Sequence, residues 1–98
     1  MKILALEKEL DNARTIDFRK NAKSEAKAVW QLYLKEIVRE FYFRKERNLA
    51  VLILEVKNKA EAKKALSKLP FVSKKLIEFE LIPLKPYPGF KRLFKQVL

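Results

Sequence analysis

Residues 49–57 read Leu-Ala-Val-Leu-Ile-Leu-Glu-Val-Lys and are apolar at almost every position. Aliphatic and β-branched residues in such a run are typical of a β-strand. Because successive side chains of a strand point to opposite faces of its sheet, this strand is apolar on both faces. Each large apolar side chain left in water would forfeit about 1.5–3 kcal/mol. The sequence therefore predicts a sheet that is covered on both faces.

The periodicity of the remaining segments predicts the order β-α-β-β-α-β. Besides residues 49–57, we expect strands at residues 3–7, 38–44 and 76–84. The first helix is expected to begin between Asp17 and Ser24 and to end at Glu36, after a loop at 8–16. Its apolar stripe, at three- and four-residue spacing, comprises Ala22, Ala26, Val29, Trp30, Tyr33 and Ile37. We expect Trp30 and Tyr33 of this stripe to be core residues rather than ligand contacts.

The second helix is expected to begin after Asn58, because Glu61 follows at the spacing of a capping box. Its core stripe is Ala62, Ala65, Leu66 and Leu69, and Pro70 is expected to end it. Residues 86–90 read as a turn, before a short amphipathic C-terminal helix with Phe90, Leu93, Phe94 and Val97 on one side. The predicted fold class is α+β, a single ferredoxin-like domain over residues 1–98 with a four-stranded antiparallel sheet.

Two helices cover only one face of such a sheet, so the second face needs another cover. The simplest cover is the same face of a second copy, which predicts a homodimer with the possibility of a larger assembly. The alternative is that the stripe from Phe90 to Val97 folds back over the face, but this stripe is short for the task.

The composition excludes several kinds of chemistry. The 98-residue chain has no Cys and no His, which removes thiolate and imidazole ligands, cysteine nucleophiles and Ser-His-Asp arrangements. We therefore expect no metal and no cofactor. The apolar stretch at the N-terminus is too short for a signal peptide, and no run is long enough to span a membrane. A cytoplasmic protein without a membrane partner is predicted.

The net charge of +11 comes from 23 Lys and Arg residues against 12 acidic residues. Such a balance is compatible with binding to nucleic acid or to an anionic membrane. However, the seven lysines within residues 57–75 occur at helical positions that point outward, opposite the alanines and leucines. We interpret them as a solvated surface.

Several segments together resemble a known family. They are Glu25-Ala26 with residues 29–33, the aromatic run at 37–44, residues 50–55, residues 79–84, and Pro86-Tyr87-Pro88-Gly89-Phe90. This pattern resembles the muconolactone-isomerase-like branch of the dimeric α+β barrel proteins, over nearly the whole chain. The resemblance implies a ferredoxin-like protomer that pairs through its sheet and binds a small organic ligand between sheet and helices. It assigns no catalytic residue here.

The candidate catalytic residues come from the register of the predicted hairpin. If Arg44 faces Leu49, then Glu40, Tyr42 and Glu55 lie on one face, and Phe41 and Phe43 lie on the helix-packing face. Carboxylates in apolar surroundings have raised pKa values and can transfer protons. Alternatively, Glu40 and Glu55 pair with Arg39, Arg44 or a partner subunit. Glu7 could join this cluster, but the sequence leaves its face open.

Three functions remain open. The first is a small-molecule binder or isomerase that shifts a proton on a small cyclic lactone or enol. The second is a non-catalytic oligomeric protein of the same fold. The third, which we disfavour, is an RNA-binding module, because such modules carry stacking aromatics on the first and third strands and these strands are aliphatic here.

Overall fold

The computed structural model describes residues 1–94 and has the predicted βαββαβ order. The elements are β1 (Lys2–Glu9), α1 (Thr15–Leu34), β2 (Val38–Phe43), β3 (Ala50–Glu55), α2 (Lys59–Leu66), α3 (Pro70–Ser73), β4 (Ile77–Leu84) and the 3₁₀ helix η1 (Gly89–Leu93). The strands form a four-stranded sheet in the order β2-β3-β1-β4, and all neighbouring strands are antiparallel. The predicted α+β fold class is therefore confirmed.

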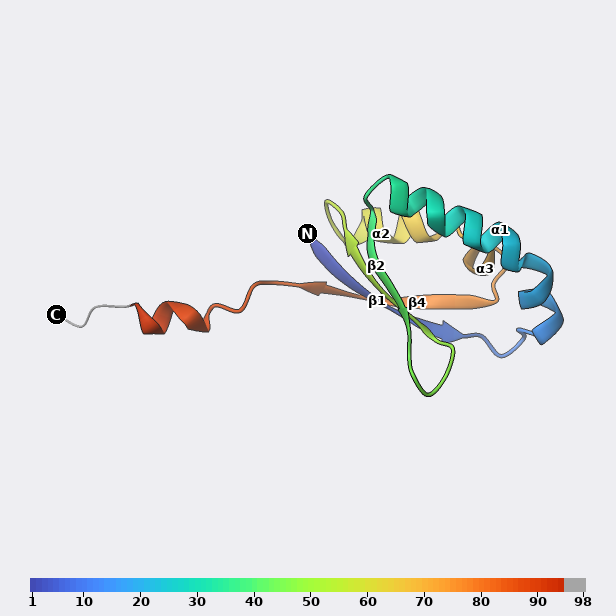
Figure 1. The fold of residues 1–98 in the computed structure, drawn as a ribbon, viewed down its shortest axis with the longest axis horizontal. Helices are drawn as coiled ribbons and strands as arrows, with labels where there is room; N and C mark the ends of the chain where they lie inside the picture. The colour runs from blue at the N-terminus through green and yellow to red at the C-terminus, as the bar shows by residue number, and fades with distance from the viewer. Residues whose placement is uncertain (95–98) are drawn as a thin grey trace.

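All three α-helices lie on the same face of the sheet (Figure 1). The core lies between this face and the helices, and its most buried members are Ile3, Ala5, Leu52, Leu54, Ala62 and Leu69. The side chain of Asn58 caps α2 as predicted, since its Oδ1 accepts a hydrogen bond from the backbone N–H of Glu61 at 2.9 Å. The lysines of residues 57–75 are exposed, as expected for a solvated surface.

Three predicted boundaries were wrong. β1 extends to Glu9 and α1 begins at Thr15, so the loop between them is shorter than residues 8–16. The start of α1 was hard to predict because Arg14, its N-cap, makes no side-chain cap and forms an ion pair with Asp17 instead (3.0 Å). Pro70 does not end α2, which stops at Leu66. Pro70 begins α3, where its missing N–H costs nothing.

The opposite face of the sheet, called the outer face below, has no helix over it within the described residues (Figure 1). Its centre is apolar and half-buried, and consists of Leu4, Leu6, Val51, Ile53 and Ile82. The registers place these residues together, because Leu4 is opposite both Ile53 and Ile82, and Leu6 is opposite Val51. The two apolar faces predicted for residues 49–57 are thus present.

Residues 85–94 extend away from the sheet and the helices (Figure 1). They make the chain elongated, with a longest dimension of 66 Å. The predicted short C-terminal helix corresponds to η1, which is a 3₁₀ helix, and Val97 of its stripe lies outside the described residues. Phe90, Leu93 and Phe94 do not fold back over the outer face, which counts against that alternative cover. Within residues 1–94, no helix has the length and apolar content of a membrane span.

Candidate functional site

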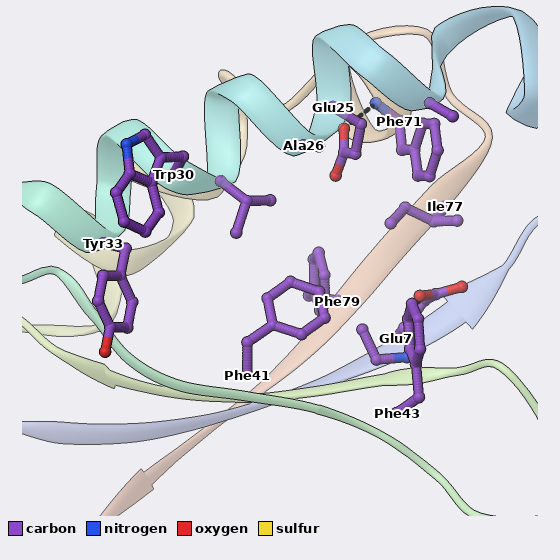
Figure 2. Close-up of a pocket in the computed structure, with 13 residues that line it drawn as sticks. Glu7, Glu25, Ala26, Trp30, Tyr33, Phe41, Phe43, Phe71, Ile77 and Phe79 are labelled. Atoms are coloured by element: carbon purple, nitrogen blue, oxygen red, sulfur yellow. Dashed lines mark hydrogen bonds between the residues drawn. The ribbon is translucent and has the colours of Figure 1, made fainter.

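A cavity of about 450 Å³ lies between α1 and the sheet (Figure 2). This volume is within the usual range for sites that bind small molecules. Residues of α1, α3 and all four strands line it. The lining includes six aromatic side chains: Trp30, Tyr33, Phe41, Phe43, Phe71 and Phe79.

The cavity lies beneath a part of α1 that presents small side chains to the sheet. Towards its N-terminus, the rings of Phe18 and Phe71 meet edge to face with centroids 5.1 Å apart. Towards its C-terminus, Leu32 is the one buried side chain of the helix, at 6% exposure. Between these points α1 presents Ala22 and Ala26, whose small side chains leave the space above the sheet unfilled.

The predicted core stripe of α1 therefore has a different role. Trp30 and Tyr33 line the cavity and are 55% and 49% exposed, so the expectation that they are core residues was wrong. Their rings stack in nearly parallel planes, with an interplanar angle of 9° and centroids 5.7 Å apart. Helical periodicity identified the side of α1 that faces the sheet, but it did not reveal the distance between helix and sheet.

Glu25 places a carboxyl group in this cavity. It belongs to α1 and points towards the sheet (Figure 2). Its Oε1 accepts a hydrogen bond from the backbone N–H of Phe71 at 2.9 Å, which fixes the side chain. Burial raises the pKa of Glu25, the hydrogen bond from Phe71 opposes this rise, and the charge of Glu7 adds to it.

Glu7 supplies the second carboxyl group, from β1. Its pairing with Phe79 of β4 places it on the helix-covered face. Its Oε1 accepts a hydrogen bond from the backbone N–H of Ala50 at 3.0 Å. Burial raises the pKa of Glu7, while that hydrogen bond lowers it and the charge of Glu9 raises it further. A carboxyl group whose pKa is raised by burial keeps its proton more readily than an ordinary carboxyl group, so such groups can serve as acid and base in proton transfer.

Apart from Glu7 and Glu25, no charged side chain lines the cavity in the described structure. The other polar groups in the lining side chains are the indole N–H of Trp30 and the hydroxyl of Tyr33. No group of three acidic side chains within residues 1–94 is arranged to hold a metal ion. The site can therefore offer proton transfer, hydrogen bonding and aromatic contact.

The residues predicted to be catalytic lie elsewhere. Glu40 and Tyr42 pair with Ile53 and Val51, and the hydrogen bond from Arg44 N to Leu49 O (2.9 Å) confirms the expected register. Glu40, Tyr42 and Glu55 consequently share the outer face and do not line the cavity. Phe41 and Phe43 are on the helix side as predicted, but they line the cavity rather than closing it.

Glu40 and Tyr42 contact each other, whereas Glu55 contacts the N-terminus of the chain. The hydroxyl of Tyr42 donates a 2.8 Å hydrogen bond to Glu40, and this bond raises the pKa of Tyr42. Glu55 forms an ion pair with the N-terminal ammonium of Met1 at 2.7 Å, which lowers the pKa of its carboxyl group. These contacts replace the pairing with Arg39 or Arg44 considered from the sequence. A catalytic role for Glu40, Tyr42 and Glu55 stays a prediction.

A sequence signal for Glu25 existed but was missed. Glu25 follows Ala22 by three positions and precedes Val29 by four, so it is an acidic residue within the apolar stripe of α1. A charged residue at such a position is buried beside apolar groups or lines a cavity. Glu7 carried no comparable signal, because β1 is apolar on both faces and the sequence does not show which of them the helices cover.

The sheet order and the single layer of helices define an α+β protein with a ferredoxin-like fold. No family model matches the sequence, and neither does any curated protein. Among solved structures, the chain is similar to 5-chloro-2-hydroxyhydroquinone dehydrochlorinase (TftG) from Burkholderia phenoliruptrix, in complex with 2,5-dihydroxybenzoquinone. The TM-score is 0.70 at 15% sequence identity, over 91% of this chain and 98% of that chain. This likeness shows a shared fold, and the finer resemblance to muconolactone isomerase stays a prediction.

Proposed function

We propose that this protein binds small ring-shaped organic molecules in the cavity between α1 and the sheet and shifts a proton on them. The observation that carries the proposal is the presence of two half-buried carboxyl groups, Glu7 and Glu25, among six aromatic side chains. A flat ring fits such a lining because aromatic side chains offer large apolar faces. The fold shared with a dehydrochlorinase of a hydroxylated ring compound is compatible with this ligand class.

The lining also defines which rings are favoured. No Lys or Arg side chain lines the cavity within the described residues, so a ligand carboxylate would find no cationic partner there. It would also be repelled by Glu7 and Glu25, and burying an unpaired charge is costly. We therefore infer neutral rings with hydroxyl or keto groups, such as phenols and cyclic enols, in preference to carboxylic acids.

The proposed reaction is an isomerisation by proton transfer. The ionised carboxylate removes a proton from a carbon beside a carbonyl group, which leaves an enolate. The proton is then returned at a different atom of the same molecule, so no other reactant is consumed. Raised pKa values suit Glu7 and Glu25 to this exchange, since each is a better base than an ordinary carboxylate and holds a proton more readily once it has taken one.

Matched ligands and matched variants test the proposal. Calorimetric titration with hydroquinone should show binding, and titration with 4-hydroxybenzoate should show at least about tenfold weaker binding because of its carboxylate. In deuterated water, NMR should show that the protein accelerates deuterium exchange beside the carbonyl of 2-cyclohexenone. Glu25→Gln and Glu7→Gln should lower this exchange by about 100-fold or more.

Glu40→Gln is the control, because it removes an exposed carboxylate of the outer face and leaves the cavity unchanged. Its exchange rate should equal that of the wild type. Equal rates for Glu25→Gln, Glu7→Gln and the wild type would instead refute their role. Loss of exchange in Glu55→Gln or Glu40→Gln would favour the set Glu40, Tyr42 and Glu55, for which the Tyr42–Glu40 hydrogen bond is the supporting observation.

We also propose that a second copy covers the outer face and makes the protein a homodimer. The apolar centre formed by Leu4, Leu6, Val51, Ile53 and Ile82 supports this pairing. Burial of such side chains against a symmetric copy would stabilise association by about 25 cal/mol for each Å² of apolar surface removed from water. Sedimentation equilibrium over a dilution series tests it, and a folded monomer at every concentration would contradict it.

A further inference from the structure

The C-terminal arm, defined as residues 85–94, carries the most exposed apolar side chains of the described structure. Tyr87 and Phe90 are each 63% exposed, Leu93 is 76% exposed and Phe94 is 80% exposed. The arm continues from the end of β4 and points away from the sheet and the helices (Figure 1). A group of large apolar side chains held in water is characteristic of an interaction surface.

The arm has local order of its own. The rings of Tyr87 and Phe90 meet edge to face with centroids 5.0 Å apart. The Tyr87 ring also covers Gly89 so closely that a Cβ atom at position 89 would overlap it. Pro86 and Pro88 restrict the backbone on either side of Tyr87. The apolar side chains are thus presented on a preformed turn, which lowers the entropy lost on binding.

The arm does not return to its own sheet. β4 pairs with β1 up to Leu84, which is opposite Lys2, and the chain then continues outward. Along residues 85–94 the arm stays clear of the sheet, and its four large apolar side chains stay exposed. Its apolar side chains are therefore available to another molecule.

The charges of the arm indicate the chemistry of that molecule. Lys85, Lys91 and Arg92 are its charged residues, so the arm is both apolar and basic. The outer face has an apolar centre and exposed carboxylates on its edge strands. These carboxylates are Glu40 on β2 and Glu78 and Glu80 on β4. The outer face also carries Lys2 and Lys8 on β1, and Lys8 pairs with Glu80 at 4.0 Å, so the carboxylates without an ion pair in the described structure are the ones that suit a basic arm best. Complementary charges of this kind favour and orient association.

We propose that two copies of this chain exchange their C-terminal arms, each arm packing along the acidic rim of the outer face of the other copy. Each copy supplies one arm and one surface that receives the arm of the other copy. Two copies therefore satisfy each other's contacts and form a two-fold symmetric dimer. The inference rests on the proposed pairing of outer faces and adds a second contact to it. It also explains why the outer face and the arm are both apolar in a chain with a net charge of +11.

A spin label tests where the arm lies. The chain has no Cys, so Lys91→Cys gives a single labelling site in the arm. In a dilution series followed by electron paramagnetic resonance, the label should be mobile in the monomer. It should become immobilised over the concentration range in which sedimentation detects the dimer. Immobilisation in the monomer as well would mean that the arm binds its own domain, and would overturn the proposal.

The same series separates the arm from the paired sheets. A label that stays mobile in a stable dimer would overturn arm exchange and leave the pairing of outer faces intact. A chain that is monomeric at every concentration would overturn both.

Truncation of the apolar contacts provides a second measurement. The double variant Phe90→Ser with Phe94→Ser should raise the dimer Kd by about 10- to 100-fold, since aromatic anchors dominate many interfaces. Both side chains are exposed in the single chain, so its circular dichroism should be unchanged. The control Lys68→Ser removes an exposed lysine of the surface outside the arm and should leave Kd unchanged. An unchanged Kd in the double variant would contradict arm exchange.

Discussion

The two faces of the sheet are both apolar, yet they differ in how that apolar surface is used. The face beneath the helices combines a tightly packed region around Leu52 and Leu54 with an open, aromatic cavity below α1. Within residues 1–94, neither of the two main cavities reaches the apolar centre of the outer face. No helix of these residues lies above this face. One face thus supplies space for a ligand, whereas the other supplies a surface for a partner.

The carboxyl groups on the two faces differ in the same way. Glu7 and Glu25 are half-buried, and burial raises their pKa values. Glu55 lies on the outer face, where the N-terminal ammonium lowers the pKa of its carboxyl group. An acidic residue therefore acquires the properties of an acid–base group from the face on which it lies, and the following predictions test this contrast.

The largest effect is expected from a charge at the centre of the outer face. Ile53→Lys should raise the dimer Kd by about 100-fold or more, because each copy would bury an unpaired ammonium group in the interface. Sedimentation equilibrium measures the change. Arg47→Ala, in the exposed β2–β3 turn, should leave Kd unchanged. If Ile53→Lys has the Kd of the wild type, the outer face is not the interface.

The next effect distinguishes packing from ligand contact along α1. Leu32→Ala should lower the free energy of unfolding by about 2–5 kcal/mol, because Leu32 is buried. Trp30→Ala should lower it by less than about 1 kcal/mol, since Trp30 is half exposed. Trp30→Ala should instead weaken hydroquinone binding by about tenfold through the lost ring contact.

Urea denaturation and calorimetric titration measure these two quantities. A large loss of stability in Trp30→Ala without any change in binding would make Trp30 a structural residue and would remove it from the proposed site.

The smallest effects concern pH, and they should have opposite signs on the two faces. Folding raises the pKa of Glu25 above its ordinary value of 4.5. Protonated Glu25 therefore stabilises the folded protein below pH 4.5, and this stabilisation is lost as the pH rises through the folded-state pKa. Glu25→Gln keeps an oxygen that can accept the Phe71 hydrogen bond and removes the buried charge. Its Tm should exceed that of the wild type by a few degrees at pH 7, and the difference should disappear near pH 4.

Glu55→Gln should show the reverse. Its pKa is lowered in the folded protein, so its stabilisation is present above pH 4.5 and is lost as the pH falls through the folded-state pKa. The variant should therefore have a lower Tm than the wild type at pH 7 and an equal Tm near pH 2. Thermal unfolding followed by circular dichroism measures both series. The same sign for Glu25→Gln and Glu55→Gln would refute the electrostatic difference between the two faces.

Structural features that depend on residues close together in the sequence were predicted better than features that depend on distant residues. The hairpin register from Glu40 to Phe43 and the Asn58 cap were predicted correctly, because neighbours in the sequence determine them. The start of α1 and the role of Pro70 were predicted wrongly, because helix boundaries depend on weak local preferences that tertiary packing overrides. The candidate catalytic residues were grouped correctly on one face, but that face is not the one with the cavity.

The sequence by itself determined the order of the elements and the apolar character of both sheet faces, because hydrophobic periodicity is a local property of the chain. Only the tertiary structure decided that Glu7 and Glu25 share a cavity. Glu7 reaches it through a strand pairing with residues about seventy positions away, and Glu25 reaches it because α1 stands off the sheet. Pairing register and the separation of packed layers depend on contacts between distant segments, so no local pattern contains them.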